Sequence, residues 1–279
     1  MTPIRMMALD VDDTLLRSDL SMSYRTRNTI KRAAAAGIVV VLASSRIPAA
    51  MERIARSLGM HKRQGYLVCN HGTIIQESST KTIIYEIRIP PESALTAFDL
   101  AHAEGFPVQL YEQGIMYVSR STEFADYDQK LTGLHQVVVE NFRDRLAAGC
   151  HKLLIPGDPM ILSPLESLLR TYIGEEVSLF TGKPYFLEIL PPQTDKGSAL
   201  AKVAEKLGIP REAVLAVGDS MNDAGMIQWA GLGVAMVNGD ERLKDLAEVV
   251  TQRSNDDDGV ADIIEGYVLR RSSQVAGHT

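Results

Sequence analysis

The chain has 279 residues, of which 45% are hydrophobic and 23% are charged, and its formal net charge at pH 7 is −6. These values are typical of a globular protein with one large core or two smaller ones. The negative charge argues against a protein that binds nucleic acid or an anionic membrane, because both partners require a basic face. A small anionic substrate remains compatible with it.

Other features of the sequence concern where the protein works. Its two cysteines are too few for a disulfide framework and fit a reducing compartment. The longest apolar stretch, residues 33–43, is too short to span a bilayer, and no signal peptide is visible. We therefore expect a cytoplasmic protein with neither a nucleic acid nor a membrane as its partner.

Residues 4–70 alternate between apolar, β-branched runs and segments with helical periodicity. Near-continuous apolar runs are typical of strands that are covered on both faces. Pro48 can open a helix, and Gly37 and Gly59 can end one. The predicted elements are strand 4–9, helix 23–36, strand 38–43, helix 48–58 and strand 65–70. This alternation predicts βαβ units and a parallel sheet.

From about residue 82 the order changes to strand, helix, strand, strand, and this order then occurs a second time. Gly114 and Gly182 separate paired strands and predict antiparallel hairpins. The predicted strands are 82–89, 107–111, 115–119, 151–156, 176–180 and 185–190, with helices after Pro91, at 121–131 and at 159–171. Two such units predict a self-contained α+β module.

After Pro191 the alternation of strands and helices returns. The predicted elements are helix 197–207, strand 213–218, helix 223–230, strand 232–236, helix 240–247, strand 248–251 and helix 260–269. We therefore expect an α/β protein whose parallel-sheet core is interrupted by an inserted α+β domain. The expected boundaries are 1–81 for the first part of the core, 82–187 for the insertion and 188–279 for the second part of the core.

Polar residues follow three of the predicted core strands directly. These residues are Asp10 and Asp12, then Ser44, Ser45 and Arg46, and finally Asp219. In open parallel sheets, ligands bind just outside the carboxyl ends of the strands. The fold therefore brings residues that are far apart in the sequence to one crevice.

The spacing of Asp10 and Asp12 allows both side chains to face the same side of a strand end. One carboxylate could then attack a substrate while its neighbour transfers protons. A solvated loop explains an isolated acidic pair equally well. These two residues alone leave that choice open.

The segment GDSMNDAG, residues 218–225, adds three further polar residues after a buried strand: Asp219, Asn222 and Asp223. Asp219 and Asp223 lie one turn apart if a helix begins here. Helix capping accounts for one of these acids, because Asp and Asn are common in the first turn. It does not account for the whole set.

Four acids would meet at the crevice: Asp10, Asp12, Asp219 and Asp223. Their repulsion in a partly desolvated cleft is on the order of several kcal/mol. A hard divalent cation relieves it, and donors that are all oxygen select Mg²⁺ over zinc. Lys196 would add a positive charge, and Ser44 at a strand-to-helix turn could hold a phosphate. Taken singly, a solvated lysine and a plain helix start are the commoner interpretations.

The order of these motifs resembles the haloacid dehalogenase (HAD) superfamily: D-x-D-x-T from Asp10, then Ser44, Lys196 and G-D-x-x-N-D from Gly218. The insertion resembles the class II type B cap of the Cof-type phosphatase branch. The segments that look like this branch are LDVDDTLL, VLASSR, LEILPPQTDKGSAL, GDSMNDAGMI and SNDDDGVA. The resemblance covers nearly the whole chain. It implies a Rossmann-like core with an inserted cap domain.

The resemblance also implies a role for each motif residue. Asp10 would be the nucleophile that forms an aspartyl-phosphate. Asp12 would protonate the leaving oxygen and then activate water, while its backbone carbonyl joins the metal shell. Asp219 would bind Mg²⁺ together with Asp10, and Asp223 would act as a ligand or as an acceptor behind the ligands. The residues implied to hold or orient the phosphoryl group are Ser44, Lys196 and Asn222.

The chain departs from the family pattern at two places. Ser45 stands where the family usually has Gly, and Asn70–Gly72 reads N-H-G instead of N-G-[AG]. Ser45 could narrow the space beside the phosphate, and His71 could contact a substrate, although solvated loop histidines are commoner. The possible substrate or cap contacts are therefore Ser45, Arg46, Asn70 and His71.

We expect a Mg²⁺-dependent phosphomonoester hydrolase for a small phosphate ester, with sugar phosphates favoured. Pyridoxal phosphate and flavin mononucleotide are alternative substrates. A phosphomutase of the phosphomannomutase type stays open, because arginines in the insertion could bind a second phosphate: Arg88, Arg120, Arg143 and Arg145. A non-catalytic phospho-accepting receiver domain is a different class, and an insertion of about a hundred residues argues against it. A dehalogenase is disfavoured, because its chemistry needs neither Asp12 nor a metal. The oligomeric state is not predicted.

Overall fold

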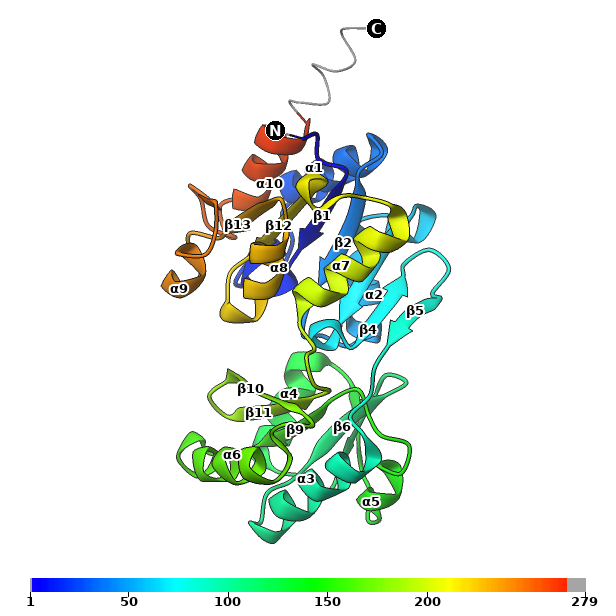
Figure 1. Cartoon of the computed structure of the whole chain (residues 1–279), viewed down its shortest axis with the longest axis vertical. Helices are drawn as coiled ribbons and strands as arrows, with labels where there is room; N and C mark the ends of the chain where they lie inside the picture. Colours follow the sequence, from blue (N-terminus) through cyan, green and yellow to red (C-terminus); the bar gives the residue numbers. More distant parts are fainter. Residues whose placement is uncertain (1, 270–279) are drawn as a thin grey trace, which may run out of the picture. The chain divides into compact units, whose positions relative to one another are not determined.

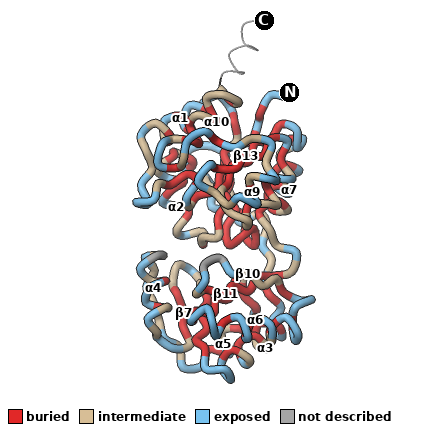
Figure 2. The backbone as a smooth tube through the Cα atoms, turned by 90° about the vertical axis from the view of Figure 1, so that its left-hand side faces the viewer, coloured by how far each residue is buried: buried red, intermediate tan, exposed pale blue. Residues whose placement is uncertain are grey.

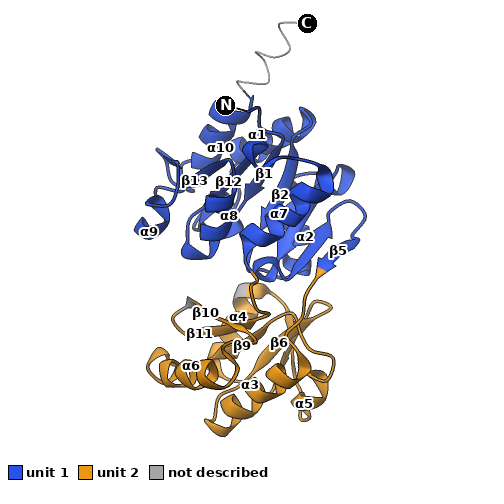
Figure 3. Ribbon diagram, viewed as in Figure 1, with its two compact units in different colours: residues 1–85, 195–279 blue, residues 86–194 orange. Residues whose placement is uncertain are grey.

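The computed structural model describes residues 2–269 and divides into two compact units. Unit 1 consists of residues 1–85 and 195–279, and unit 2 consists of residues 86–194 (Figure 3). These boundaries differ from the expected insertion, residues 82–187. Strand β5 (Ile83–Glu86) lies at the edge of the unit 1 sheet, and β11 (Phe186–Leu190) of the unit 2 sheet continues past residue 187. Within residues 2–269, no helix is both long and apolar enough to cross a membrane.

The described part of unit 1 contains an eight-stranded sheet with the order β14-β13-β12-β1-β2-β3-β4-β5. Besides β5, its strands are β1 (Met6–Leu9), β2 (Val39–Ala43), β3 (Gly65–Cys69), β4 (Ile74–Glu77), β12 (Val214–Gly218), β13 (Leu232–Ala235) and β14 (Val249–Val250). Neighbouring strands from β14 to β3 are parallel, which confirms the predicted α/β fold class. β4, which the sequence pattern did not predict, is antiparallel to β3.

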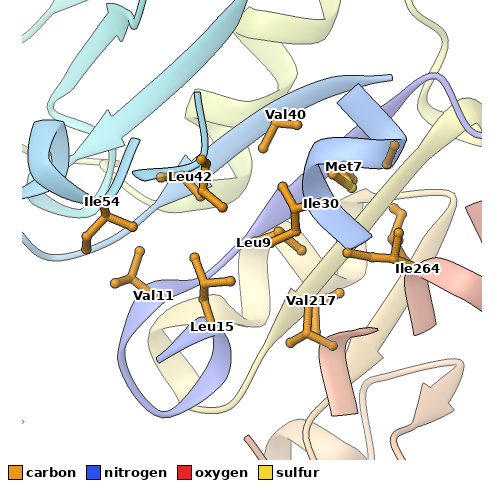
Figure 4. Packing of buried hydrophobic residues seen from close by; sticks show 14 of the residues in the cluster. Met7, Leu9, Val11, Leu15, Ile30, Val40, Leu42, Ile54, Val217 and Ile264 are labelled. Atoms are coloured by element: carbon orange, nitrogen blue, oxygen red, sulfur yellow. The ribbon is translucent and has the colours of Figure 1, made fainter. Parts of the chain in front are cut away.

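Helices cover both faces of this sheet (Figure 1). One face carries α1 (Tyr24–Ala35), α2 (Pro48–Ser57) and α10 (Gly259–Ile263), and the other carries α7 (Lys196–Leu207), α8 (Ala224–Trp229) and α9 (Glu241–Lys244). Successive side chains of β1 point to opposite faces, so Leu9 packs with Ile30 and Val217 (Figure 4) while Ala8 joins the other cluster. Both faces are therefore apolar, and the central strands β1, β3, β12 and β13 are buried throughout their length (Figure 2).

Unit 2, whose backbone is described throughout, contains a six-stranded sheet with the order β10-β11-β9-β6-β7-β8. Besides β11, its strands are β6 (Gln109–Glu112), β7 (Ile115–Val118), β8 (His135–Val138), β9 (Leu153–Pro156) and β10 (Ser178–Lys183). Its helices are α3 (Pro91–Ala103), α4 (Glu123–Thr132), α5 (Phe142–Arg145) and α6 (Pro159–Ile173). α3 and α6 pack on one face of the sheet. The sequence predicted the hairpins β6–β7 and β10–β11, but neither β8 nor α5.

Candidate active site

The register of the parallel strands brings three polar strand ends together. Leu9 of β1 pairs with Leu42 of β2 and with Val217 of β12. The backbone N–H of Asp10 donates a hydrogen bond to the Val217 carbonyl, at 2.9 Å. Asp10 therefore leaves the sheet beside the ends of β2 and β12, where the chain continues into Ser44 and Asp219 respectively.

Lys196 is the central cation of the site. Its side chain is fully buried, and its Nζ lies 2.6 Å from Asp10 Oδ1 and 2.6 Å from Asp223 Oδ1. The ammonium group also donates a hydrogen bond to Asn222 Oδ1, with 3.2 Å between Nζ and that oxygen. Burial alone lowers the pKa of Lys196, but the charges of Asp10 and Asp223 outweigh it and raise that pKa above its ordinary value. The lysine therefore stays charged inside the protein.

The position of Lys196 follows from the start of α7. Asp195 caps this helix, because its Oδ1 accepts hydrogen bonds from the backbone N–H groups of Gly197 and Ser198 at 2.6 and 3.1 Å. Lys196 is the first helical residue, and the cap orients it toward the strand ends. The sequence carries this signal as an Asp directly before the helix, although no role was predicted for Asp195.

Three carboxylates lie around this lysine. Asp10, Asp219 and Asp223 each offer an oxygen within 4.8 Å of the others. Burial, followed by the charge of Asp223, raises the pKa of Asp10 well above its ordinary value. The same two causes raise the pKa of Asp219 to about 6. One ammonium group does not neutralise three carboxylates. The carboxylate oxygens of the cluster fit a hard divalent cation such as Mg²⁺.

The pKa of Asp219 predicts how metal affinity depends on pH. Below about pH 6 this carboxyl is protonated in the metal-free protein, so a cation must displace the proton. We expect the dissociation constant for Mg²⁺, measured by isothermal titration calorimetry, to rise as the pH falls through that value, by up to about tenfold per pH unit for each ligand carboxyl that takes up a proton. In Thr14→Val the rise in the dissociation constant should begin at a higher pH, because the Thr14 hydroxyl lowers the pKa of Asp219. An affinity for Mg²⁺ that stays constant from about pH 5 to 8 would contradict the expectation that Asp219 is a metal ligand.

Asp223 and Thr14 hold the Asp219 loop in place. Asp223 Oδ2 accepts the backbone N–H groups of Asp219 and Ser220 at 3.0 and 3.2 Å, so the capping interpretation is correct for this oxygen. Its Oδ1 binds Lys196. Thr14 Oγ1 donates to Asp219 Oδ1 at 3.0 Å and directly links the first and last motifs. The sequence analysis included Thr14 in the D-x-D-x-T motif but predicted no role for it.

Asp12 is placed differently from the other acids. Its carboxylate accepts two hydrogen bonds from Arg46, from Nε at 2.8 Å and from Nη2 at 2.5 Å, which raise the pKa of Arg46. Its side chain is 41% exposed, against 7% for Asp10. Arg46, expected as a substrate contact, is therefore a partner of Asp12 in this structure. That the Asp12 backbone carbonyl joins a metal shell stays a prediction.

Ser44 is buried, and its Oγ accepts the Arg46 backbone N–H at 3.1 Å. The Ser44–Arg46 loop is tied to the next strand end: Asn70 N–H donates to the Arg46 carbonyl at 2.9 Å, and His71 N–H donates to the Ser44 carbonyl at 3.1 Å. The half-buried Ser45 lies within this loop. The predicted phosphate contact thus lies in a loop that two backbone hydrogen bonds restrain.

The Asn70–Gly72 turn packs against the start of α7. All three of its residues have positive φ, at 47°, 57° and 105°. A Cβ at Gly72 would lie 2.6 Å from the Asp195 carbonyl oxygen, so only glycine fits here. Among the residues that the structure describes, Asn70 Oδ1 is buried without a hydrogen-bond partner. Contact of Asn70 or His71 with a substrate stays a prediction.

Comparisons with known proteins agree with this arrangement. A family model described as haloacid dehalogenase-like hydrolase matches residues 7–264. The putative phosphatase YxeH of Bacillus subtilis (strain 168) is 28% identical over 272 residues, covering 96% of this chain and 99% of that protein. The 5-amino-6-(5-phospho-D-ribitylamino)uracil phosphatase YcsE of the same organism is 29% identical over 266 residues, covering 95% and 96%. The crystal structure of a haloacid dehalogenase-like hydrolase from Bacteroides thetaiotaomicron has a TM-score of 0.89 at 32% identity and covers 94% of this chain and 98% of that chain.

Proposed function

The chain belongs to the haloacid dehalogenase-like hydrolase family and is a phosphatase that acts on a small phosphorylated substrate, and from this premise we propose that it is a Mg²⁺-dependent phosphomonoester hydrolase working through an aspartyl-phosphate on Asp10. The observation that carries the proposal is the buried Asp10–Lys196–Asp223 ion cluster beside Asp219. It joins a carboxylate that can attack to positive charge that can receive a phosphoryl group.

In the proposed first step, a carboxylate oxygen of Asp10 attacks phosphorus and the bond from phosphorus to the leaving oxygen breaks. Lys196 and the Ser44 hydroxyl bind the phosphoryl oxygens, and Asp12 gives its proton to the leaving oxygen. In the second step, Asp12 takes a proton from water, which attacks phosphorus and releases phosphate from Asp10. Mg²⁺, held by Asp10 and Asp219, would neutralise charge on the phosphoryl oxygens.

Arg46 orients Asp12 for both proton transfers through two parallel hydrogen bonds. Asn222 helps to position Lys196, because its Oδ1 accepts from both Lys196 Nζ and Ser220 Oγ. These contacts support the proposed roles of Asp12 and Lys196. The division of roles among them is our proposal.

We favour sugar phosphates or related polyol phosphates as substrates, with unit 2 as the cap that selects among them. One relative is named for a substrate that carries a phosphorylated ribityl chain. A phosphomutase is less well supported, because the four arginines considered for a second phosphate bind separate partners. These pairs are Arg88 with Glu86, Arg120 with the Gly105 carbonyl, Arg143 with Asp99 and Arg145 with Glu112.

The role of Asp12 can be tested with leaving groups that differ in their need for a proton. On a sugar phosphate, Asp12→Asn should lower kcat/KM, which reports the steps up to departure of the leaving group, about 10²- to 10⁴-fold, because the departing alkoxide needs a general acid. On p-nitrophenyl phosphate the loss should be smaller, because p-nitrophenolate leaves without a proton. The measurement is phosphate release by the wild type and the variant, with Mg²⁺ and with EDTA.

Asp19→Asn is the matched control, because Asp19 lies on the same connection between β1 and α1 and its hydrogen bond from the Ser21 N–H survives the change. It should hydrolyse both substrates at the wild-type rate. Equal losses of kcat/KM on the two substrates in Asp12→Asn, or turnover in EDTA, would contradict the mechanism. An isomerised sugar phosphate would identify a mutase, and a long-lived phosphoprotein without turnover would identify a signalling domain.

A further inference from the structure

The segment Ser254–Gly259, which reads SNDDDG, has no part in the proposed chemistry, yet it is bonded to the loop that carries Asp12. Asn255 is only 7% exposed, and its Nδ2 donates to the Leu16 carbonyl at 3.0 Å. Its backbone N–H donates to Asn238 Oδ1 at 3.1 Å. Asn238 Nδ2 in turn donates to the Asp13 carbonyl at 2.8 Å. The two asparagines thus bind two carbonyl groups of the same short loop, at Asp13 and at Leu16.

Asn238 lies in a turn, residues 236–240, that also packs on the Asp219 loop. Met236 N–H donates to the Gly218 carbonyl at 2.9 Å, and Asp240 N–H donates to the Asp219 carbonyl at 2.8 Å. A Cβ at Gly239 would lie 2.3 Å from the Asp219 carbonyl oxygen, so the turn can approach only with glycine here. Asn238 therefore bridges the loop of Asp12 and the loop of Asp219.

The loop that these asparagines bind needs external restraint. Asp12 is extended, with φ −76° and ψ 135°, whereas Asp13 is left-handed, with φ 56° and ψ 7°. A backbone hydrogen bond from Leu16 N–H to the Val11 carbonyl, at 2.8 Å, closes the turn. Left-handed residues other than glycine persist only where the surroundings hold them. Asn238 binds the carbonyl of this left-handed residue, which directly follows Asp12.

We propose that Asn238 and Asn255 are positioning residues that hold the Asp12 loop at a fixed place against the Asp219 loop. The inference rests on the proposed function for its catalytic consequence. A purely structural role would instead lower the fraction of folded protein and leave the folded molecules fully active. The two roles therefore differ in kcat per folded molecule and in the local order of the loop.

The test compares Asn255→Ala, Asn238→Ala and the double variant with the wild type. In folded protein, kcat for p-nitrophenyl phosphate should fall about tenfold or more, since small misplacements of catalytic groups are costly, while KM changes less than about threefold. The double variant should be no worse than the more damaged single variant, because both residues belong to one chain of hydrogen bonds. Amide hydrogen exchange of residues 9–17 in metal-free protein should become faster.

Asp256→Ala is the matched control. It removes two hydrogen bonds, from Ser18 N–H at 2.9 Å and Ser18 Oγ at 2.8 Å, between the same segment and the residues just beyond the loop. It should keep the wild-type kcat and the wild-type exchange in residues 9–14. Wild-type kcat in Asn255→Ala and Asn238→Ala, an equal loss in Asp256→Ala, or unchanged exchange in the asparagine variants would overturn the proposal.

Asn238 is exposed, so Asn238→Ala remains informative if Asn255→Ala does not fold. Exchange in the metal-free protein needs no assumption about the reaction. Faster exchange in residues 9–17 therefore supports the positioning role even if Asp10→Asn remains active, a result that would refute the proposed function alone. If the asparagine variants exchange as slowly as the wild type while Asp10→Asn is inactive, the positioning role alone is refuted.

Discussion

Replacing Asp10 by Asn is expected to lower kcat for any phosphomonoester at least about 10³-fold, the largest effect at any single position. The amide has no charged oxygen for attack on phosphorus. Because Lys196 and Asp223 remain, the variant should still fold, and its thermal midpoint should stay near that of the wild type. The measurements are phosphate release at saturating Mg²⁺ and thermal unfolding.

Asp13→Asn provides the matched control for this variant. Asp13 is exposed, lies in the same loop and has a left-handed conformation that asparagine readily adopts. We expect it to keep kcat within about twofold of the wild type, as a surface substitution does. If Asp10→Asn retains substantial turnover, a nucleophile other than Asp10 must act and the aspartyl-phosphate is excluded.

Replacing Lys196 by Met is expected to lower the free energy of unfolding by about 3–5 kcal/mol in metal-free protein at neutral pH. The methionine fills a similar volume, but Asp10 and Asp223 lose the ammonium group that lies 2.6 Å from each. Both are buried, so their charges would be left uncompensated. Phosphatase activity should be lost as well. Denaturant unfolding in EDTA measures the change in stability.

Two further observations separate this charge effect from a packing defect. The destabilisation should shrink as the pH falls, because Asp10, whose pKa burial and Asp223 already raise, then takes up a proton in the folded state. Lys206→Met, an exposed lysine on the same helix, should change the free energy of unfolding by less than about 0.5 kcal/mol. A destabilisation of Lys196→Met that is independent of pH would contradict the ion-cluster explanation.

Long-range pairing explains where the predicted elements and the structure differ. The apolar run at residues 82–89 reads as a strand in any context, but its partner β4 places residues 83–86 in the unit 1 sheet. β8 is a short parallel strand beside β7, and it was not predicted because no local turn connects the two. Local periodicity identifies a strand, whereas hydrogen bonding to a distant segment decides its sheet.

The gathering of Asp10 and Asp219 could be foreseen, because carboxyl ends of parallel strands share one edge of a sheet, whereas Lys196 starts a helix and follows no core strand. The partners of these residues could not. Nothing near Asp12 or Thr14 in the sequence indicates that the first binds Arg46 and the second binds Asp219. The backbone path of each loop decides which neighbours such side chains contact.

The sequence by itself determined the alternation of strands and helices, the order of the polar motifs and hence the family, because apolar periodicity and short motifs are local properties. Only the tertiary structure decided that Lys196 is buried between two carboxylates, that Arg46 faces Asp12 and that Asn238 and Asn255 bridge two loops. These contacts join residues separated by 17 to 239 positions. Their geometry depends on strand register and loop path, which no local stretch of sequence encodes.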